Sequence, residues 1–345
     1  MIYDAMQQLS CLDRPPEPMI EPRLNYVSCP GFAASSTPAS WNDSPPAADS
    51  GQMPSHRMAY WEWNGTGNPD HPHVVLCVHG LTRQGRDFDT LARALCRHVR
   101  VICPDVVGRG HSDWLADASG YQIPVYAGDM LALLAHLHQQ APLETLDWVG
   151  TSMGGLIGMA VCGHPDLPLP VPVRRLVLND VGPALEWDAL ERIGQYLGAP
   201  VRFASVEEGA AALWTTSSSF GPHTPDQWLE LSRPMLRRPA DSDSWVMHYD
   251  PALAGPFRSL QREAAQESEA QLWQLYDQIT ARTLVLRGAE SDLLSPASAQ
   301  AMAQRGPKAQ ILEFAHVGHA PTLMADDQVA AVRDFLLGAP GSGAA

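Results

Sequence analysis

The seven residues Val149–Gly155, which read V-G-T-S-M-G-G, constrain this chain more than any other stretch. They contain the pattern Gly-x-Ser-x-Gly. A short run rich in β-forming residues, 145–149, precedes the pattern, and an uncharged apolar run, 155–162, follows it with helical character. Strand, sharp turn and helix are the context in which this pattern presents a nucleophilic serine. We therefore expect Ser152 in a strained turn, with glycines at 150 and 154 because a Cβ there would crowd strand and helix.

Apolar runs and amphipathic segments alternate along most of the chain. The run 73–78 is nearly continuous, as in a strand covered on both faces, and 99–104, 173–179 and 283–288 are also predicted strands. Further strands are predicted at 58–63, 145–149 and 310–314, and helices at 88–95, 124–140, around 272–279 and 326–337. This alternation predicts an α/β fold built on a mostly parallel sheet with helices on both faces.

The alternation is interrupted once and is absent from both ends. Residues 184–270 read as helices and loops without a convincing strand, and we interpret them as a helical insertion. The core is then formed by 56–183 and 271–338. Residues 1–55 are rich in Pro, Ser and Ala and are expected to be mostly irregular or to wrap the surface, whereas 339–345 are expected to form a frayed tail.

A serine hydroxyl is a weak nucleophile and needs a base, which in turn needs an orienting carboxylate. Groups that must meet in a parallel sheet lie in loops at the carboxyl ends of strands. Asp292 follows the strand 283–288, and His319 follows the last strand, so the order Ser152, Asp292, His319 predicts the catalytic triad.

Each role has rivals. Asp180 also lies just beyond a strand and is the main alternative to Asp292, whereas Glu290 is a weaker one. We favour Asp292 because Gly-x-x-x-Asp after that strand is the usual arrangement, although it could instead be a turn or cap residue ahead of the helix near Pro296. For the base, His319 is favoured over His316 because Gly318 gives its loop the freedom to turn the ring inward.

Acyl transfer also requires donors for the developing oxyanion. The N–H groups of Met153, at the start of the helix after Ser152, and of Leu81, after His79-Gly80, are the predicted pair. His79 is expected to brace its loop by hydrogen bonding. Arg109 and His111 are expected to hold the neighbouring loop, with substrate binding as the minority interpretation.

Composition excludes several classes of function. The formal net charge of −15 argues against nucleic acid or an anionic membrane surface as a partner. No apolar stretch is long enough to span a bilayer and the first residues do not resemble a secretory signal, so a cytoplasmic protein is expected. The six cysteines form no Cys-x-x-Cys pair and are interpreted as reduced core residues. No metal or cofactor is predicted, and the oligomeric state stays open.

Taken together, the motifs resemble those of the α/β-hydrolase superfamily, specifically its branch of capped esterases and carbon–carbon hydrolases of ring-fission products. The resemblance covers about residues 57–338 and rests on a joint set of motifs: His79-Gly80, Asp105–Ser112 (D-x-x-G-x-G-x-S), Gly150–Gly154, Asp292 and Gly318-His319. It implies an eight-stranded sheet, a helical cap over the serine inserted after strand six, and hydrolysis without a cofactor.

The resemblance does not specify the substrate. The expected function is a serine hydrolase that cleaves a small or medium carboxylic ester through an acyl-enzyme. Carbon–carbon bond hydrolysis, acyl transfer or lactone hydrolysis at the same site remain alternatives, and a non-catalytic ligand-binding member is a further one. Aromatic residues of the insertion suggest an apolar substrate moiety, with Trp187, Trp214 and Phe220 as candidate contacts, although each could instead pack the cap against the core.

Overall fold

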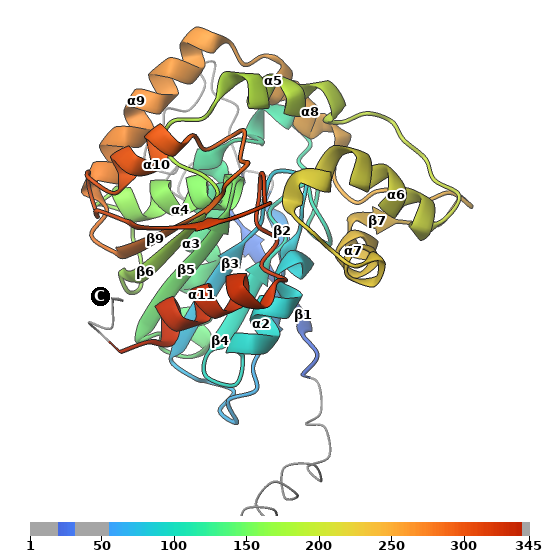
Figure 1. Cartoon of the computed structure of the whole chain (residues 1–345). Coiled ribbons are helices and arrows are strands. Elements are labelled where there is room, and N and C mark those ends of the chain that lie inside the picture. Colours follow the sequence, from blue (N-terminus) through green and yellow to red (C-terminus); the bar gives the residue numbers. More distant parts are fainter. Residues whose placement is uncertain (1–19, 32–54, 340–345) are drawn as a thin grey trace, which may run out of the picture.

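The computed structural model describes residues 20–31 and 55–339. Most of the predicted 1–55 extension, and all but the first residue of the predicted tail at 339–345, lie outside these ranges. Within them, the chain forms one large sheet with helices packed on its faces and a helical lobe at one end (Figure 1).

The sheet has eight strands in the order β1-β2-β4-β3-β5-β6-β9-β10. β2 pairs antiparallel with both β1 and β4, and the remaining neighbours are parallel. The predicted mostly parallel, eight-stranded sheet is confirmed. The strands are β1 (Arg23–Cys29), β2 (His56–Trp63), β3 (His73–Val78), β4 (Arg100–Pro104), β5 (Thr145–Thr151), β6 (Val173–Asn179), β9 (Arg282–Gly288) and β10 (Gln310–Phe314).

Helices cover both faces of the sheet because its central strands are apolar on both sides. On one face lie α2 (Asp89–Leu95), which continues the 3₁₀ turn Gly85–Phe88, and α11 (Asp326–Leu337). The opposite face carries α3 (Ile123–Gln140), α4 (Met153–Gly163), α9 (Arg262–Gln278) and α10 (Pro296–Met302). Figure 1 shows α2 and α11 together in front of the sheet.

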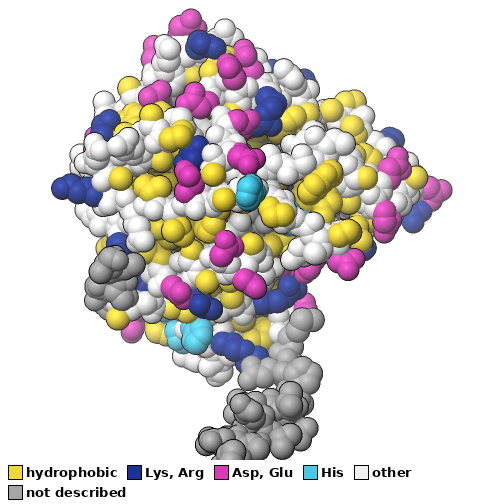
Figure 2. Space-filling view, in the orientation of Figure 1, with side chains coloured by type: hydrophobic (Ala, Val, Ile, Leu, Met, Phe, Trp, Pro, Cys, Tyr) yellow, Lys and Arg dark blue, Asp and Glu magenta, His cyan; other side chains and the backbone are white. Residues whose placement is uncertain are grey.

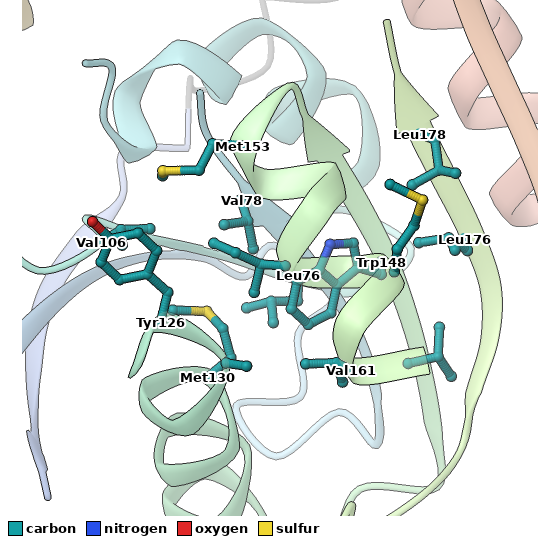
Figure 3. Close-up of a cluster of buried hydrophobic side chains, with 14 of the residues drawn as sticks. Leu76, Val78, Val106, Tyr126, Met130, Trp148, Met153, Val161, Leu176 and Leu178 are labelled. Carbon is teal, nitrogen blue, oxygen red and sulfur yellow. The ribbon is translucent and has the colours of Figure 1, made fainter. Parts of the chain in front are cut away.

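Buried side chains of β3, β5 and β6 form the centre of the larger core cluster (Figure 3). Trp148, fully buried on β5, donates its indole N–H to the carbonyl of Gly154 at 3.1 Å. A Cβ on Gly158 would lie 2.6 Å from the same indole nitrogen. The tryptophan therefore fixes how closely α4 approaches the sheet, and with it the position of the turn that precedes α4.

The insertion after β6 is a helical cap, as expected, but it also holds a small sheet. β7 (Leu236–Arg237) and β8 (Val246–Met247) pair antiparallel, so the expectation of a strand-free insertion was wrong. Its helices are α5 (Trp187–Tyr196), α6 (Val206–Ser217), α7 (Pro225–Ser232) and α8 (Ala254–Arg258), with 3₁₀ turns at Ser218–Phe220, Arg233–Met235 and Pro251–Leu253. α9 starts at Arg262, so one continuous helix crosses the boundary expected near residue 270.

A strand within the N-terminal extension was not predicted. β1 pairs along its whole length with β2, from Arg23 opposite Glu62 to Cys29 opposite His56. Its sequence, R-L-N-Y-V-S-C, alternates only weakly in polarity, and it buries just Val27 and Cys29. An edge strand needs a single partner and a single buried face, so its local signal is small. Part of the presumed irregular extension is therefore an edge of the sheet.

Acidic and basic side chains are interspersed over the face drawn in Figure 2. No helix among the described residues is long and apolar enough to cross a membrane. The five cysteines that the structure describes are free, and Cys77 and Cys103 lie in β3 and β4 as predicted.

Candidate active site

The Gly-x-Ser-x-Gly segment forms the sharp turn between β5 and α4. Ser152 has φ 51°, a left-handed conformation that L-residues rarely adopt. A Cβ on Gly150 would lie 2.3 Å from the carbonyl oxygen of Gly154, and one on Gly154 would lie 1.9 Å from that of Val78. Both glycines are therefore required by close backbone approach, as the sequence predicted.

Three side chains from three loops converge at this turn. Nε2 of His319 lies 3.0 Å from Oγ of Ser152, and Nδ1 of His319 lies 2.7 Å from Oδ2 of Asp180. Because a carboxylate only accepts, Nδ1 carries the proton and Nε2 accepts from the serine hydroxyl. Asp180 is fully buried, whereas the His319 side chain is 11% exposed. The arrangement can remove the serine proton and stabilise the imidazolium that results.

The Asp180 carboxylate is held by two further donors. The N–H of Gly288 donates to Oδ1 at 2.9 Å, and the hydroxyl of Ser291 donates to Oδ2 at 2.6 Å. Both come from the end of β9 and the loop after it. A Cβ on Gly288 would lie 2.4 Å from the carbonyl of Val317, so glycine lets this loop and the histidine loop meet. The loop expected to supply the acid instead supplies hydrogen bonds to it.

The expected position of Asp292 beside His319 is wrong. Its side chain is 50% exposed and pairs with Arg192 of the cap at 2.6 Å. Ser291, one residue earlier, takes the inward position of this loop, so Asp292 points away from the histidine. The available signal for Asp180 was its place directly after a buried strand. Glu290, the weaker alternative, is also exposed and lies 3.8 Å from His316.

The loop that carries His319 is tied to the serine turn. The side-chain amide of Asn179, the last residue of β6, donates to Oγ1 of Thr151 at 3.0 Å and to the carbonyl of Pro321 at 2.8 Å. Sequence reasoning did not single out Asn179. His316, the rival base, has a side chain that is 87% exposed.

The two residues predicted to supply the oxyanion donors come from the start of α4 (Met153) and from the loop after β3 (Leu81). Met153 is the first residue of α4, where backbone N–H groups lack an acceptor within the helix. A Cβ on Gly80 would lie 3.7 Å from Cβ of Ser152, which places the Gly80-Leu81 backbone against the serine. The Leu81 carbonyl accepts a hydrogen bond from Nε of Arg109 at 2.8 Å.

His79 braces the Leu81 loop, as expected. The N–H of Val106 donates to its Nε2 at 2.9 Å, so Nδ1 carries the proton and donates to the Gly80 carbonyl at 2.7 Å. The pKa of His79 is lowered to about 3, mainly by burial; the Gly80 carbonyl opposes this shift, and the positive charge of Arg109 contributes to it. The ring is therefore a neutral structural link between two loops of the site.

Removing this imidazole is expected to reduce the acid sensitivity of the fold. The unfolded chain protonates His79 below about pH 6.5 while the folded chain does not, so stability falls as pH drops toward about 3, by roughly 1.4 kcal/mol per pH unit. His79→Asn should flatten the free energy of unfolding between pH 6 and 4.5, measured by urea titration. His98→Gln, at an exposed histidine, is the control. Equal slopes for wild type and His79→Asn would contradict the assignment.

The carboxylate of Asp105, in the Asp105–Ser112 motif, links the loop after β4 to the 3₁₀ turn at Gly85. Oδ1 of Asp105 accepts the N–H of Gly85 at 2.8 Å, and Oδ2 accepts that of His111 at 2.9 Å. Burial raises the pKa of Asp105 to about 6, which its N–H donors oppose. A Cβ on Gly110 would lie 2.3 Å from Oδ2 of Asp105, so the second glycine of the motif leaves room for this carboxylate.

The cap contacts the loops that form the site. The carbonyl of Ser219 accepts the N–H of Gly318, next to His319, at 2.5 Å, and that of His248 accepts the N–H of Gly110 at 3.0 Å. Arg83, in the Leu81 loop, donates to the carbonyl of Leu231 at 3.2 Å. A cap anchored at these three points lies next to the Ser152 turn.

The three aromatic candidates for substrate contact have packing partners of their own. Trp187 lies under the Arg262 guanidinium, 5.4 Å away. The rings of Trp214 and Phe220 pack edge-on against Trp228 at 4.9 and 6.5 Å. These contacts hold the cap together, and substrate contact by the three residues stays a prediction.

Among the described residues, one group of three could offer ligands to a metal ion. Cys29, His56 and Asp129 are all buried, and their ligand atoms lie within 4.8 Å of one another. Nε2 of His56 lies 3.0 Å from Oδ2 of Asp129, a contact that ties β2 to α3. The group lies at the β1 edge of the sheet and none of its members belongs to the Ser152 site.

Comparison with known proteins agrees with this architecture. Residues 75–332 match the family model described as "Alpha/beta hydrolase family". The chain belongs to the alpha/beta hydrolase family. The expected α/β-fold hydrolase is thereby confirmed at the level of the family.

One relative of named activity and two solved structures are similar to most of this chain. The chain is 52% identical over 286 residues to the 3-hydroxybutyrate-oligomer hydrolase of Cupriavidus necator, covering 82% of this chain and 94% of the relative. Among solved structures, an alpha/beta hydrolase from Novosphingobium aromaticivorans is 32% identical with a TM-score of 0.72, covering 92% of this chain and 99% of the other. A putative hydrolase from Rickettsia typhi has a TM-score of 0.75 at 25% identity, covering 91% and 98%.

Proposed function

We propose that this protein is a serine esterase that cleaves short hydroxyacid esters through an acyl-enzyme, with Ser152, His319 and Asp180 as its triad. The observation that carries the proposal is the chain of two hydrogen bonds from Ser152 through His319 to Asp180, 3.0 and 2.7 Å long. Such a chain lets the imidazole act as a general base toward the serine hydroxyl. Asp180 thus replaces Asp292 in the predicted triad.

The geometry supports the following sequence of steps. Oγ of Ser152 attacks the ester carbonyl while Nε2 of His319 takes its proton. The N–H groups of Leu81 and Met153 donate to the oxyanion of the tetrahedral intermediate. When the intermediate collapses, the ester bond breaks and His319 returns the proton to the leaving alkoxide. A water molecule then loses a proton to His319 and attacks the acyl-enzyme carbonyl. Collapse of this second intermediate breaks the bond between the acyl group and Oγ of Ser152, which takes the proton back from His319 as the acid leaves.

The substrate class is inferred from the relative that acts on 3-hydroxybutyrate oligomers. Identity of 52% across 94% of that protein supports a related ester as substrate here. For a dimer of 3-hydroxybutyrate, attack on the internal ester would leave a 3-hydroxybutyryl group on Ser152 and release one 3-hydroxybutyrate. Hydrolysis of that group would release the second.

A panel of substrates with purified protein tests the proposal. We expect release of 3-hydroxybutyrate from its dimer and trimer, and p-nitrophenyl butyrate to be hydrolysed with a kcat/KM at least about tenfold above that of the dodecanoate ester. Ser152→Ala measured in parallel is the control. If the protein hydrolyses p-nitrophenyl esters but releases no 3-hydroxybutyrate from the dimer, it is an esterase of another specificity.

Two further outcomes of the panel separate the alternatives. Faster turnover of a dienoic diketone than of any ester would indicate a carbon–carbon hydrolase, and preferential turnover of lactones or acylation of an added alcohol would indicate a lactonase or an acyltransferase. A non-catalytic member would hydrolyse none of these compounds, and its Ser152 would not be labelled by a fluorophosphonate probe.

A further inference from the structure

Arg109 carries a buried positive charge directly behind the proposed oxyanion donors. It lies between Gly108 and Gly110 of the loop after β4, and its exposure is 0%. Those glycines have φ of 85° and 52°, conformations that favour glycine. The loop is also bound to the cap, because the N–H of Asp250 donates to the Gly108 carbonyl at 2.7 Å. Arg109 is therefore held in place from both sides.

The guanidinium contacts both residues that supply the oxyanion donors. Its Nε donates to the carbonyl of Leu81 at 2.8 Å, and its Nη2 lies 3.4 Å from the sulfur of Met153. Its Nη1 donates to the carbonyl of Val107 at 2.7 Å. The Met153 side chain reaches from the start of α4 toward the region of Val106 and Tyr126 (Figure 3). The Arg109 guanidinium lies over the Tyr126 ring, 4.9 Å from its centroid.

These partners are unusual for a buried cation, because two carbonyls, a thioether and an aromatic ring are all uncharged. Burial of a charge is costly unless it is paired, and a hydrophobic residue of similar volume would avoid that cost. The nearby Asp250 instead accepts the hydroxyl of Tyr121 at 2.5 Å. Because none of the groups bonded to Arg109 is a carboxylate, its bonded partners do not neutralise the charge of the guanidinium.

We propose that Arg109 is a positioning residue for the oxyanion hole, an inference that rests on the proposed esterase function. Its bond to the Leu81 carbonyl restrains the backbone that carries the Leu81 N–H, and its contact with Met153 restrains the first residue of α4. Its positive charge adds to that of the helix N-terminus at the place where negative charge develops. The arginine therefore stabilises the transition state more than the bound ester.

Substitution of Arg109 tests this inference, with Arg175 as a matched control. Arg175 is also buried, and it donates to the backbone carbonyls of Leu336 and Gly338 at 2.5 and 2.7 Å, far along the strands from Ser152. We expect Arg109→Met to lower kcat for p-nitrophenyl butyrate by about 10²-fold with KM changed less than about threefold. Arg109→Lys, which keeps the charge, should lose less. Arg175→Met should lower the thermal midpoint and leave kcat within about threefold.

A transition-state analogue separates positioning from general damage. The inhibition constant of a trifluoromethyl ketone, which forms a tetrahedral oxyanion on Ser152, should rise in Arg109→Met by the same factor as kcat/KM falls. Competitive inhibition by butyramide should be unchanged. If Arg109→Met does not fold, the same proportionality is measured in Arg109→Lys.

Several results would overturn the inference. An unchanged kcat in Arg109→Met, or an equal loss of kcat in Arg175→Met, would contradict the role assigned to Arg109. A rise in the KM of Arg109→Met that is confined to substrates with a free carboxylate would instead make Arg109 a substrate-binding residue. The measurements begin with wild-type protein that turns over esters and is labelled at Ser152. Failure at that first step would refute the proposed function itself, and so is distinct from failure of the role assigned to Arg109.

Discussion

Ser152→Ala is expected to lower kcat for p-nitrophenyl butyrate by about 10⁴-fold or more, because no other group replaces the attacking oxygen. The residual rate would come from the oxyanion donors and from binding alone. The structural cost should be small, because the hydroxyl is replaced by hydrogen at a position whose backbone is held by β5 and α4. Steady-state kinetics, together with the mass of the protein after fluorophosphonate treatment, measure the effect.

The thermal midpoint controls for loss of fold in this experiment. Ser152 has a positive φ, which alanine tolerates no better than serine, so both variants carry the same backbone strain and should melt within a few degrees of each other. Ester turnover within tenfold of wild type in Ser152→Ala would refute the assignment of the nucleophile. It would also remove the basis for the roles proposed for His319 and Asp180.

Asp180→Asn is expected to lower kcat by about 10³- to 10⁴-fold, whereas Asp292→Asn should change it by less than about threefold. Asparagine is neutral and has one oxygen acceptor where aspartate has two, so it cannot hold the proton on Nδ1 of His319 and stabilise the imidazolium as the carboxylate does. Asp292 pairs with Arg192 on the surface, and that ion pair contributes little. The two variants make the same chemical change and differ only in which carboxylate faces the histidine.

A reversal of this ranking would restore the triad expected from sequence and would mean that the loop after β9 rearranges during turnover. The hydroxyl of Ser291 offers an intermediate test. Because it donates to Asp180 at 2.6 Å, Ser291→Ala should lower kcat modestly, by about tenfold or less, without shifting KM.

Much of the framework was available from local sequence. β3, β6 and β10 begin and end at the predicted residues, because clusters of apolar and β-branched residues bounded by turn signals identify short strands. The position of Ser152 was equally clear, since the steric demands at Gly150 and Gly154 are met within a few residues of the chain or against β3. Strands and turns whose causes lie within a few neighbouring residues can therefore be predicted from the sequence alone.

The choice of acid was not a local property. Asp180 and Asp292 both follow strands, and chain order alone favours neither. Packing decided it, because Ser291 and Gly288 face inward from the β9 loop and donate to Asp180, while Arg192 of the cap pairs with Asp292. The same holds for β1, whose pairing with β2 has a weak sequence signal because only one of its faces is buried.

The sequence by itself thus determined the class of fold and predicted Ser152 and His319 as site residues, since these follow from apolar periodicity, the turn motif and the order of loops after the strands. Only the tertiary structure decided which carboxylate meets the histidine and that the guanidinium of Arg109 lies behind Leu81 and Met153. The physical reason is that side-chain partners across loops are selected by burial and hydrogen-bond geometry between residues more than a hundred positions apart in some cases. No window of sequence contains that information.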